Sequence, residues 1–521
     1  MYSCRGKLSQ KRDRSHGFVC GKCNKEDYIM NKKALAVILT GAMAGTLLAG
    51  CGSSGSTTAP STAASDSAAA STEAAAAAST AAESTAAESS ASDTSSKNLP
   101  EVSSDPITIT MWDIATEDPG KSTMETAVQE FMKDYPQVTV EENHLQNDNY
   151  KQQLVVAMSS GQCPDMYVSW GGGPLTEYYN SGFVNDLTDL YNNYDHPDFF
   201  DSAIAQGTID GKLAAIPFNG ISGCCVYYNK TIFNEVGLEV PTTIDELEDC
   251  CEKLKAAGYT PFSLANGSKW TGSMYYMYLV ARHSGNDEFN AAYTQENGGS
   301  FTSEAFVWAS DKIQDWVKKG YFPDGVNSLS TDDGQDRQLM YDGTCAMMLH
   351  GSWQCGSMYT DNADWYTQNI GVFRFPEDAE AKANGVPQDV EVGTAIDTAF
   401  SFNCWNSDGT VDQNKLNACY ILATQYINND EYNMKKIQLE NKVLNINGYD
   451  QYITDENMKT VNKIFQDASN VQLWYDQYLP ASVTEVHKNC MTELFGLEKN
   501  GQEIGEEEDA AMQAALADSN S

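Results

Sequence analysis

The stretch DGKLAAIPF, residues 210–218, and the stretch VYYNKTIFNEVGLEVPTTIDEL, residues 226–247, hold the most specific local signals in the chain. Their pattern predicts a strand, a turn, a second strand and a helix that ends at Gly237, since glycine adopts the left-handed conformation common after helix C-termini. The next helix is predicted to begin at Thr243, whose hydroxyl caps it while Glu246 reaches back, as in a capping box. Strands and helices therefore alternate here.

The residues ahead of this stretch repeat the alternation. We expect strands at residues 107–111, 138–140 and 165–169, with helices at 122–135 and 150–159 between them. Such a succession predicts a parallel sheet covered on both faces, with ligands bound beyond the carboxyl ends of the strands. Trp112 and Trp170 occupy two successive strand ends of this kind, so both are candidate ligand contacts.

These blocks, in this order, resemble the signature of the extracellular solute-binding proteins of ABC importers, the family of maltose-binding protein. Later blocks agree: QLMYDGTCAMM at 338–348, HGSW at 350–353 and WYDQYLP at 474–480. The resemblance covers about residues 105–500. It implies an α/β, two-lobed periplasmic-binding-protein-like fold of type II, with the ligand cleft between lobes that are joined by hinge crossings.

The resemblance also implies a domain division. The first lobe is expected to hold residues 105–217 and 376–447, and the second residues 218–375 and 448–500, with a crossing near Pro217. Residues 501–521 remain as an acidic C-terminal tail. The implied function is capture of a carbohydrate, as an oligosaccharide, by hinge closure and its delivery to an ABC permease, by a monomer without a catalytic role.

The first hundred residues carry export signals. Residues 30–50 read as a lipoprotein signal peptide, with a basic start and an apolar run too short to stay as a membrane span. Their ending resembles a bacterial lipobox, which makes Cys51 the expected lipidated residue on the extracytoplasmic face of the cell membrane. Residues 51–104, rich in Ser, Thr, Ala and Glu, are expected to be a disordered tether. Residues 1–29 fit no secretory signal and are expected to be a miscalled leader.

Composition excludes some partners. The formal net charge of −39 argues against nucleic acid and against an anionic lipid surface as the main partner, since both attract basic proteins. The few histidines are scattered, and the acidic run at 332–336 lacks the alternation of a calcium loop, so no metal or cofactor is expected. Ten cysteines follow Cys51. We expect mostly buried thiols, although disulfides remain open.

Aromatic residues are the first candidates for sugar contacts, because flat rings pack against the C–H faces of sugars. The family resemblance places rings that stack on sugar at Trp353 and near Trp270 and Trp170, and a further ring at Trp474. Each of these tryptophans also has the alternative of packing in a hydrophobic core.

Polar candidates match the hydroxyl edges of a sugar, since hydrogen bonds to charged groups are stronger than neutral ones. Asp113 and Glu117 follow the first strand, and Asn219 lies just past the first crossing. Asp397 resembles a cleft position near another crossing, and Asp476 accompanies Trp474. In so acidic a chain, an ordinary surface position is the alternative for each carboxylate. Asp165, by contrast, is expected to shape the backbone.

Other functions stay open at this stage. A secreted glycoside hydrolase would share aromatic clefts and need two carboxylates, but the ordered blocks behind a lipobox favour capture over cleavage. The same fold can bind a non-sugar solute or report occupancy to a membrane sensor. Lys269, next to Trp270, leaves an acidic sugar possible.

Overall fold

The computed structural model describes residues 97–519, so the expected leader, signal peptide and lipidated Cys51 lie outside the described residues. The described part begins inside the segment expected to be a tether. There the Asn98 amide N–H donates to Asp195 Oδ2 at 2.9 Å, and Asn98 Nδ2 donates to the Asn193 carbonyl at 2.7 Å. Residues 97–104 are thus attached to the first lobe and are not part of a disordered tether.

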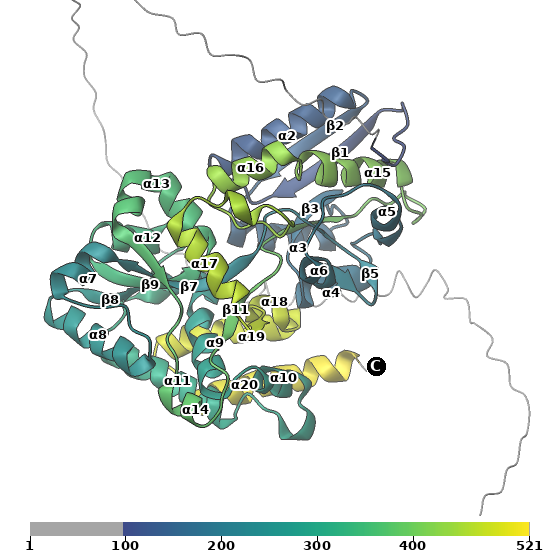
Figure 1. Cartoon of the computed structure of the whole chain (residues 1–521). Helices are drawn as coiled ribbons and strands as arrows, with labels where there is room; N and C mark the ends of the chain where they lie inside the picture. Colours follow the sequence, from purple (N-terminus) through teal and green to yellow (C-terminus); the bar gives the residue numbers. More distant parts are fainter. Residues whose placement is uncertain (1–96, 520–521) are drawn as a thin grey trace, which may run out of the picture.

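The first lobe is built on a five-stranded sheet in the order β2-β1-β3-β12-β6 (Figure 1). Its strands are β1 (Ile107–Asp113), β2 (Val138–His144), β3 (Met166–Ser169), β6 (Ile216–Pro217) and β12 (Ala399–Phe402). β1 runs parallel to β2 and β3, whereas β12 is antiparallel to β3 and β6. The other elements of this lobe are α2 (Gly120–Asp134), α3 (Asn147–Ser159), α4 (Gly173–Asn180), α5 (Thr188–Asn193), α6 (Asp201–Gln206), the hairpin β4 (Thr208–Ile209) and β5 (Lys212–Leu213), α15 (Gln413–Ile421) and α16 (Asp430–Gln438).

The second lobe has a six-stranded sheet in the order β13-β11-β7-β9-β8, with β10 also pairing with β7. Its strands are β7 (Ser222–Asn229), β8 (Thr260–Ser263), β9 (Cys345–Gly351), β10 (Ile370–Phe373), β11 (Val390–Thr394) and β13 (Asn470–Gln472). Its helices are α7 (Lys230–Val236), α8 (Ile244–Ala256), α9 (Trp270–Ser284), α10 (Asp287–Thr294), α11 (Glu304–Lys318), α12 (Gln335–Tyr341), α13 (Trp353–Asn369), α14 (Ala379–Ala383), α17 (Glu456–Gln466), α18 (Tyr475–Tyr478), α19 (Ala481–Phe495) and α20 (Gly501–Ser519). The expected two-lobed α/β fold is confirmed.

The local signals around residue 230 appear as predicted. Gly237 ends α7 in the left-handed conformation. Thr243 and Glu246 form the complete capping box at the start of α8. Asp165 is structural, since its carboxylate accepts from the Thr110 amide and hydroxyl, both at 2.9 Å, and pairs with Lys415 Nζ at 2.8 Å. These contacts tie the strand β1 to the helix α15.

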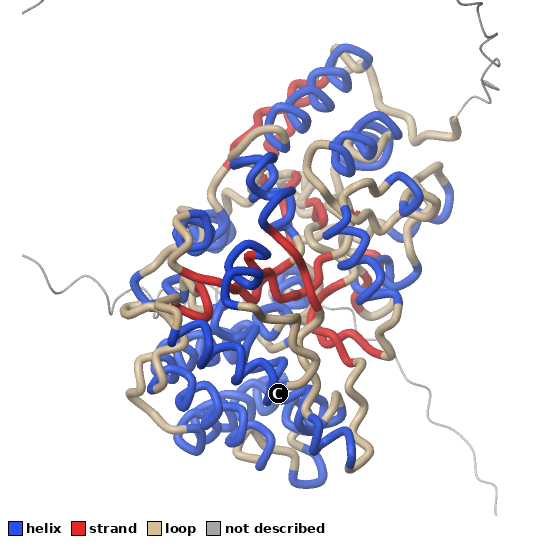
Figure 2. The backbone as a smooth tube through the Cα atoms, turned by 60° about the vertical axis from the view of Figure 1, so that its left-hand side comes forward, coloured by secondary structure: helices blue, strands red, loops and turns tan. Residues whose placement is uncertain are grey.

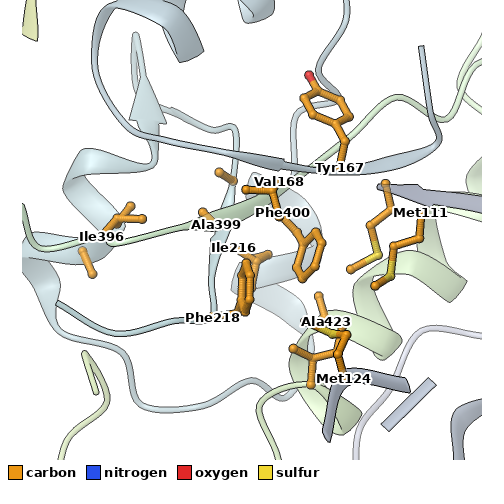
Figure 3. Close-up of a cluster of buried hydrophobic side chains, with 14 of the residues drawn as sticks. Met111, Met124, Tyr167, Val168, Ile216, Phe218, Ile396, Ala399, Phe400 and Ala423 are labelled. Atoms are coloured by element: carbon orange, nitrogen blue, oxygen red, sulfur yellow. The ribbon is translucent and has the colours of Figure 1, made fainter. Parts of the chain in front are cut away.

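Two hydrophobic clusters form the core. One fills the first lobe around Met111, Tyr167 and Phe400 (Figure 3) and continues onto the face of the second sheet that carries Cys225 and Tyr227. The other covers the opposite face of that sheet. Helices flank the strands of both sheets (Figure 2). Because β7 is covered on both faces, it reads as an almost continuous buried run rather than as an alternating one.

The chain passes between the lobes three times, and the three crossings meet at Gly220. The Gly220 carbonyl accepts from the Asp397 amide at 2.8 Å and from Asn445 Nδ2 at 3.2 Å, and Asn445 Nδ2 also donates to the Ala395 carbonyl at 3.0 Å. Gly220 itself has φ +89°, and a Cβ there would lie 2.1 Å from the Val443 carbonyl oxygen. Only glycine therefore allows the crossings to lie this close.

The second crossing between the lobes lies later in the sequence than expected. β11 pairs antiparallel with β7, so the second crossing lies near residue 395 rather than 376, and residues 376–394 belong to the second lobe. The boundary that the family resemblance implied lies too close to the N-terminus, because no turn motif marks that crossing.

The expected acidic tail at 501–521 is instead, over 501–519, the packed helix α20. Ile504 and Met512 are buried among its carboxylates, and the helix packs against α11 and α19. Two apolar side chains in so acidic a run give too weak a periodicity to predict a packed face. Within residues 97–519, no helix combines the length and the apolar character needed to cross a bilayer.

Replacing Asn445 by alanine tests the junction of the crossings. Asn445 is 1% exposed, and its loss leaves two buried carbonyls with fewer partners, so Asn445→Ala should lower the free energy of unfolding in urea by about 1–3 kcal/mol. The exposed Asn384→Ala is the control and should change it by less than about 0.5 kcal/mol. Equal effects of the two substitutions would contradict this role for Asn445.

Candidate ligand-binding cleft

A cleft of about 340 Å³ lies between the two lobes and is lined by residues from both. Its size falls within the range of small-molecule sites. Nine of the ten residues predicted as ligand contacts line it: Trp170, Trp270, Trp353, Trp474, Asp113, Glu117, Asn219, Asp397 and Asp476. Positions that are far apart in the sequence are thus brought to one cavity.

Three indoles form a continuous wall on the second lobe. The ring centroids of Trp270 and Trp353 are 5.9 Å apart, as are those of Trp353 and Trp474, with tilts of 58° and 59°. The wall exists because Trp270 and Trp353 are the first residues of α9 and α13 and Trp474 precedes α18. His350 packs edge-on against both Trp270 and Trp353, at 5.5 and 5.4 Å, which fixes the ring positions.

The first lobe contributes the facing ring, Trp170. Its edge meets Tyr150 at 5.9 Å, and Lys151 Nζ lies 4.6 Å from its ring centroid. Lys151 also reaches Asp476 on the other lobe at 3.6 Å. Asp332 of the second lobe accepts from the Asp148 amide of α3 at 3.0 Å. The two lobes therefore touch each other across the mouth of the cleft.

Several buried polar atoms of the cleft lining have no hydrogen-bond partner among the described residues. They include Asp113 Oδ2, Trp270 Nε1, Gln354 Oε1, Thr398 Oγ1, Glu440 Oε1, Tyr475 Oη and Gln477 Oε1. Buried polar groups are nearly always paired, because leaving one unpaired costs about 1–3 kcal/mol. A cluster of such groups in one cavity is what a site for a polyhydroxylated ligand requires.

A polar group lies at the hinge side of the cleft. Lys442 Nζ donates to Asn219 Oδ1 at 2.5 Å and pairs with Glu440 Oε2 at 3.2 Å. Burial raises the pKa of the neighbouring Asp397 to about 6, against the opposing effect of the Lys442 charge, and the Glu440 carboxylate raises it further. This corner of the cleft thus holds a carboxyl group that changes charge near neutral pH.

Trp112 is the one predicted contact that the structure does not bring to the cleft. Side chains alternate along a strand, and Met111 and Asp113 are fully buried on the face opposite to Trp112. Trp112 packs against the core of the first lobe instead. Position at a strand end therefore leads to the cleft for Asp113 but not for its neighbour.

Sequence reasoning missed other residues of the lining, including Gln354, Glu440, Lys442, Tyr475 and Gln477. Gln354, Tyr475 and Gln477 stand inside or next to the motifs around Trp353 and Trp474, so proximity to those motifs was a usable signal. Glu440 and Lys442 had no motif and reach the cleft only through the third crossing.

Two groups among the described residues are compact enough to hold a cation. Asp113, Glu142 and His144 offer ligand atoms within 4.8 Å of one another, and so do Cys490, Glu493 and Glu507. In the first group, Asp113 Oδ1 already bonds to His144 Nδ1 at 2.8 Å, and burial raises the pKa of Glu142 to about 7. A proton and these hydrogen bonds can account for that group. The absence of a metal stays a prediction.

The sequence matches a known protein family. The sequence profile of the bacterial extracellular solute-binding proteins matches residues 115–399, more than half of the chain. The chain belongs to this family. The family consists of extracellular binding proteins rather than enzymes.

Individual relatives are more distant. A multiple sugar-binding protein of Streptococcus mutans is 24% identical over 282 residues, which cover 51% of this chain and 61% of the relative. An uncharacterised ABC transporter extracellular-binding protein of Pyrococcus horikoshii is 25% identical over 242 residues, 45% of this chain and 53% of the relative. The chain thus spans little more than half the length of these curated relatives. A solved chitin oligosaccharide binding protein has a TM-score of 0.70 at 20% identity, covering 79% of this chain and 99% of that protein, and shares the fold.

The raised pKa of Asp397 gives a testable pH dependence. Its carboxyl group ionises near its ordinary value of 3.8 in the unfolded chain and near 6 in the folded protein, so ionisation lowers stability as the pH rises from about 4 to about 6. Asp397→Asn removes this cost. Relative to the wild type, its free energy of unfolding should therefore rise between pH 4 and pH 7, on the order of 1–3 kcal/mol.

Urea unfolding at the two pH values measures the difference, with the exposed Asp311→Asn as the control. A difference between Asp397→Asn and the wild type that stays constant with pH would show that this carboxyl group titrates normally.

Proposed function

We propose that the protein captures a carbohydrate, an oligosaccharide, in the cleft between its lobes and delivers it to the permease of an ABC importer. One observation carries the proposal: the wall of Trp270, Trp353 and Trp474 stands in the same cavity as a set of buried polar atoms without protein partners. Indole faces suit the C–H faces of sugars, and the polar atoms suit their hydroxyls. Few other ligands need both.

The binding mechanism follows from the arrangement of the lobes. A sugar ring packs on the indole wall of the second lobe and offers its hydroxyls to Asp113, Glu440 and Gln354. Trp170 approaches from the first lobe when the crossings flex around Gly220. Micromolar affinity corresponds to about −8 kcal/mol, which a few stacked rings and hydrogen bonds supply after the costs of lost ligand freedom.

The relatives support the choice of ligand class. The Streptococcus mutans relative is a multiple sugar-binding protein, and the solved protein of the same fold binds chitin oligosaccharides. For this chain we infer in addition lipidation at Cys51, attachment to the extracytoplasmic face of the membrane and a monomeric state. The signal-like sequence of residues 30–51 and membership of an extracellular family support the anchor.

Lys269 does not support an acidic sugar as the ligand. Lys269 Nζ donates to Asn489 Oδ1 at 2.7 Å, and the residue does not line the cleft. The cations that do line it are already paired: Lys151 with Asp476, Arg337 with Asp361 and Lys442 with Glu440. Unpaired charge in the cleft is therefore negative, which favours a neutral ligand.

Replacing the central indole tests the proposal. Trp353→Ala removes the ring that contacts both other indoles, so it should weaken binding of a neutral oligosaccharide at least tenfold, a loss of about 1.4 kcal/mol or more. Calorimetric titration with maltotriose, chitotriose, xylotriose and raffinose measures the affinity. Trp365→Ala is the matched control, because Trp365 lies on the same helix α13 but packs on Tyr341, outside the cleft lining.

The expected result is a tenfold loss for Trp353→Ala with the fold intact by circular dichroism, and no loss for Trp365→Ala. Unchanged affinity in Trp353→Ala would remove the indole wall from the binding site.

The charge of the cleft gives a second test. Trigalacturonate should bind at least tenfold more weakly than the best neutral trisaccharide, because its carboxylates meet an excess of negative charge without a free cation in the lining. Titrations of both at two salt concentrations separate this repulsion from a poor fit, since salt screens only the former. Tighter binding of the acidic trisaccharide would contradict a neutral-sugar site.

A further inference from the structure

A buried chain of hydrogen bonds runs from the last helix to the cleft. Ser273 Oγ lies 2.6 Å from His487 Nε2, and His487 Nδ1 lies 2.6 Å from Glu508 Oε1. Ser273 lines the cleft and is 5% exposed, while His487 and Glu508 are fully buried. The three residues come from α9, α19 and α20, so the chain connects the C-terminal helix to the ligand site.

The carboxyl group at one end of this series of hydrogen bonds indicates which atom donates in each bond. A carboxylate only accepts hydrogen bonds, and Glu508 also faces the Tyr276 hydroxyl at 3.4 Å. With Glu508 ionised and the imidazole neutral, His487 Nδ1 carries the proton that bonds to Glu508, which leaves Nε2 as an acceptor. The Ser273 hydroxyl then donates to Nε2, and its oxygen offers only lone pairs to the cleft. The same order of bonds orients histidine and serine in hydrolase triads.

Two aromatic rings pack against His487. Tyr475 meets the imidazole edge-on at 5.0 Å, and Tyr276 lies at 5.8 Å. Cys490, on the same helix α19, is buried and interacts with Glu508. Glu508 bonds to the imidazole at Nδ1, which favours the Nδ1–H form of the ring.

Ser273 has a complementary neighbour in the lining. Trp270 precedes it by three residues on α9, so the two side chains share one helix face. The indole Nε1 of Trp270 is a buried donor without a partner among the described residues. The helix face that carries the Ser273 acceptor therefore also carries a donor, and a hydroxyl is a ligand group that can both donate and accept. Amide groups and ethers cannot fill both roles at a single atom.

We propose that Ser273 is a hydrogen-bond acceptor for a hydroxyl of the bound sugar, and that His487 and Glu508 are positioning residues that hold it in that role. The inference rests on the proposed function. It makes α20, the acidic end of the chain, part of the binding site although the helix does not line the cleft. Specificity for a hydroxyl at this point then depends on a residue of the last helix.

The tautomer of His487 tests the hydrogen bonds between Ser273, His487 and Glu508 without any sugar. In histidine-labelled protein, long-range ¹⁵N–¹H spectra should show His487 as the neutral Nδ1–H form, assigned by its loss in His487→Gln. Glu508→Gln keeps the side-chain size but can donate to Nδ1, so His487 should change to the Nε2–H form. Glu507, one residue earlier, pairs with Lys499 and not with His487. Glu507→Gln should therefore leave the spectrum unchanged. A doubly protonated His487 in the wild type would overturn the proposal.

The contact itself is tested by calorimetry with maltotriose, chitotriose, xylotriose and raffinose. Ser273→Ala should weaken the best of these about three- to tenfold, the effect of one hydrogen bond, and Glu508→Gln should weaken it by a similar factor. Ser284→Ala, at the other end of α9, and Glu507→Gln should bind as the wild type does. Full affinity in Ser273→Ala would overturn this inference and leave the proposed function standing. Failure of the wild type to bind any of the four sugars would overturn both.

Discussion

The structure depends on the point where three chain crossings meet. Gly220 passes under the Val443 carbonyl, and Asn445 bonds to the carbonyls of the other two crossings. Each lobe is assembled from separate stretches of chain, so the lobes share no sheet. They are held together by this junction, by the core cluster that continues from the first lobe onto the second sheet, and by the contacts across the cleft mouth. The proposed hinge closure would bend the chain at this junction.

The two lobes contribute different kinds of side chain to the cleft. The second lobe supplies the indole wall, and His350 packs edge-on against two of its rings. The first lobe and the crossings supply mainly carboxylates and amides, with Asp397 and Lys442 beside the hinge itself. The candidate ligand contacts thus lie on both sides of the junction. Contacts that form only when the joint closes are what couples binding to a change of shape.

Much of this was readable from the sequence, for identifiable reasons. The capping box at Thr243, the glycine stop at Gly237 and the strand ends near Asp113 are local signals, and local signals predicted local structure correctly. The indoles were found because their motifs stand in family order. Trp112 failed because strand position does not say which face a side chain takes. The role of α20 and the crossing at residue 395 depend on packing and strand pairing between distant segments, which no local pattern carries.

The central claim is that an oligosaccharide binds between the lobes on the indole wall. A crystal structure of residues 97–521 with the tightest-binding of the four neutral oligosaccharides tests it most directly. The account predicts a sugar ring packed against Trp353, with hydroxyls on the unpartnered atoms of Asp113 and Gln354. Sugar bound elsewhere on the molecule, or an indole wall left in contact with solvent in the complex, would contradict it.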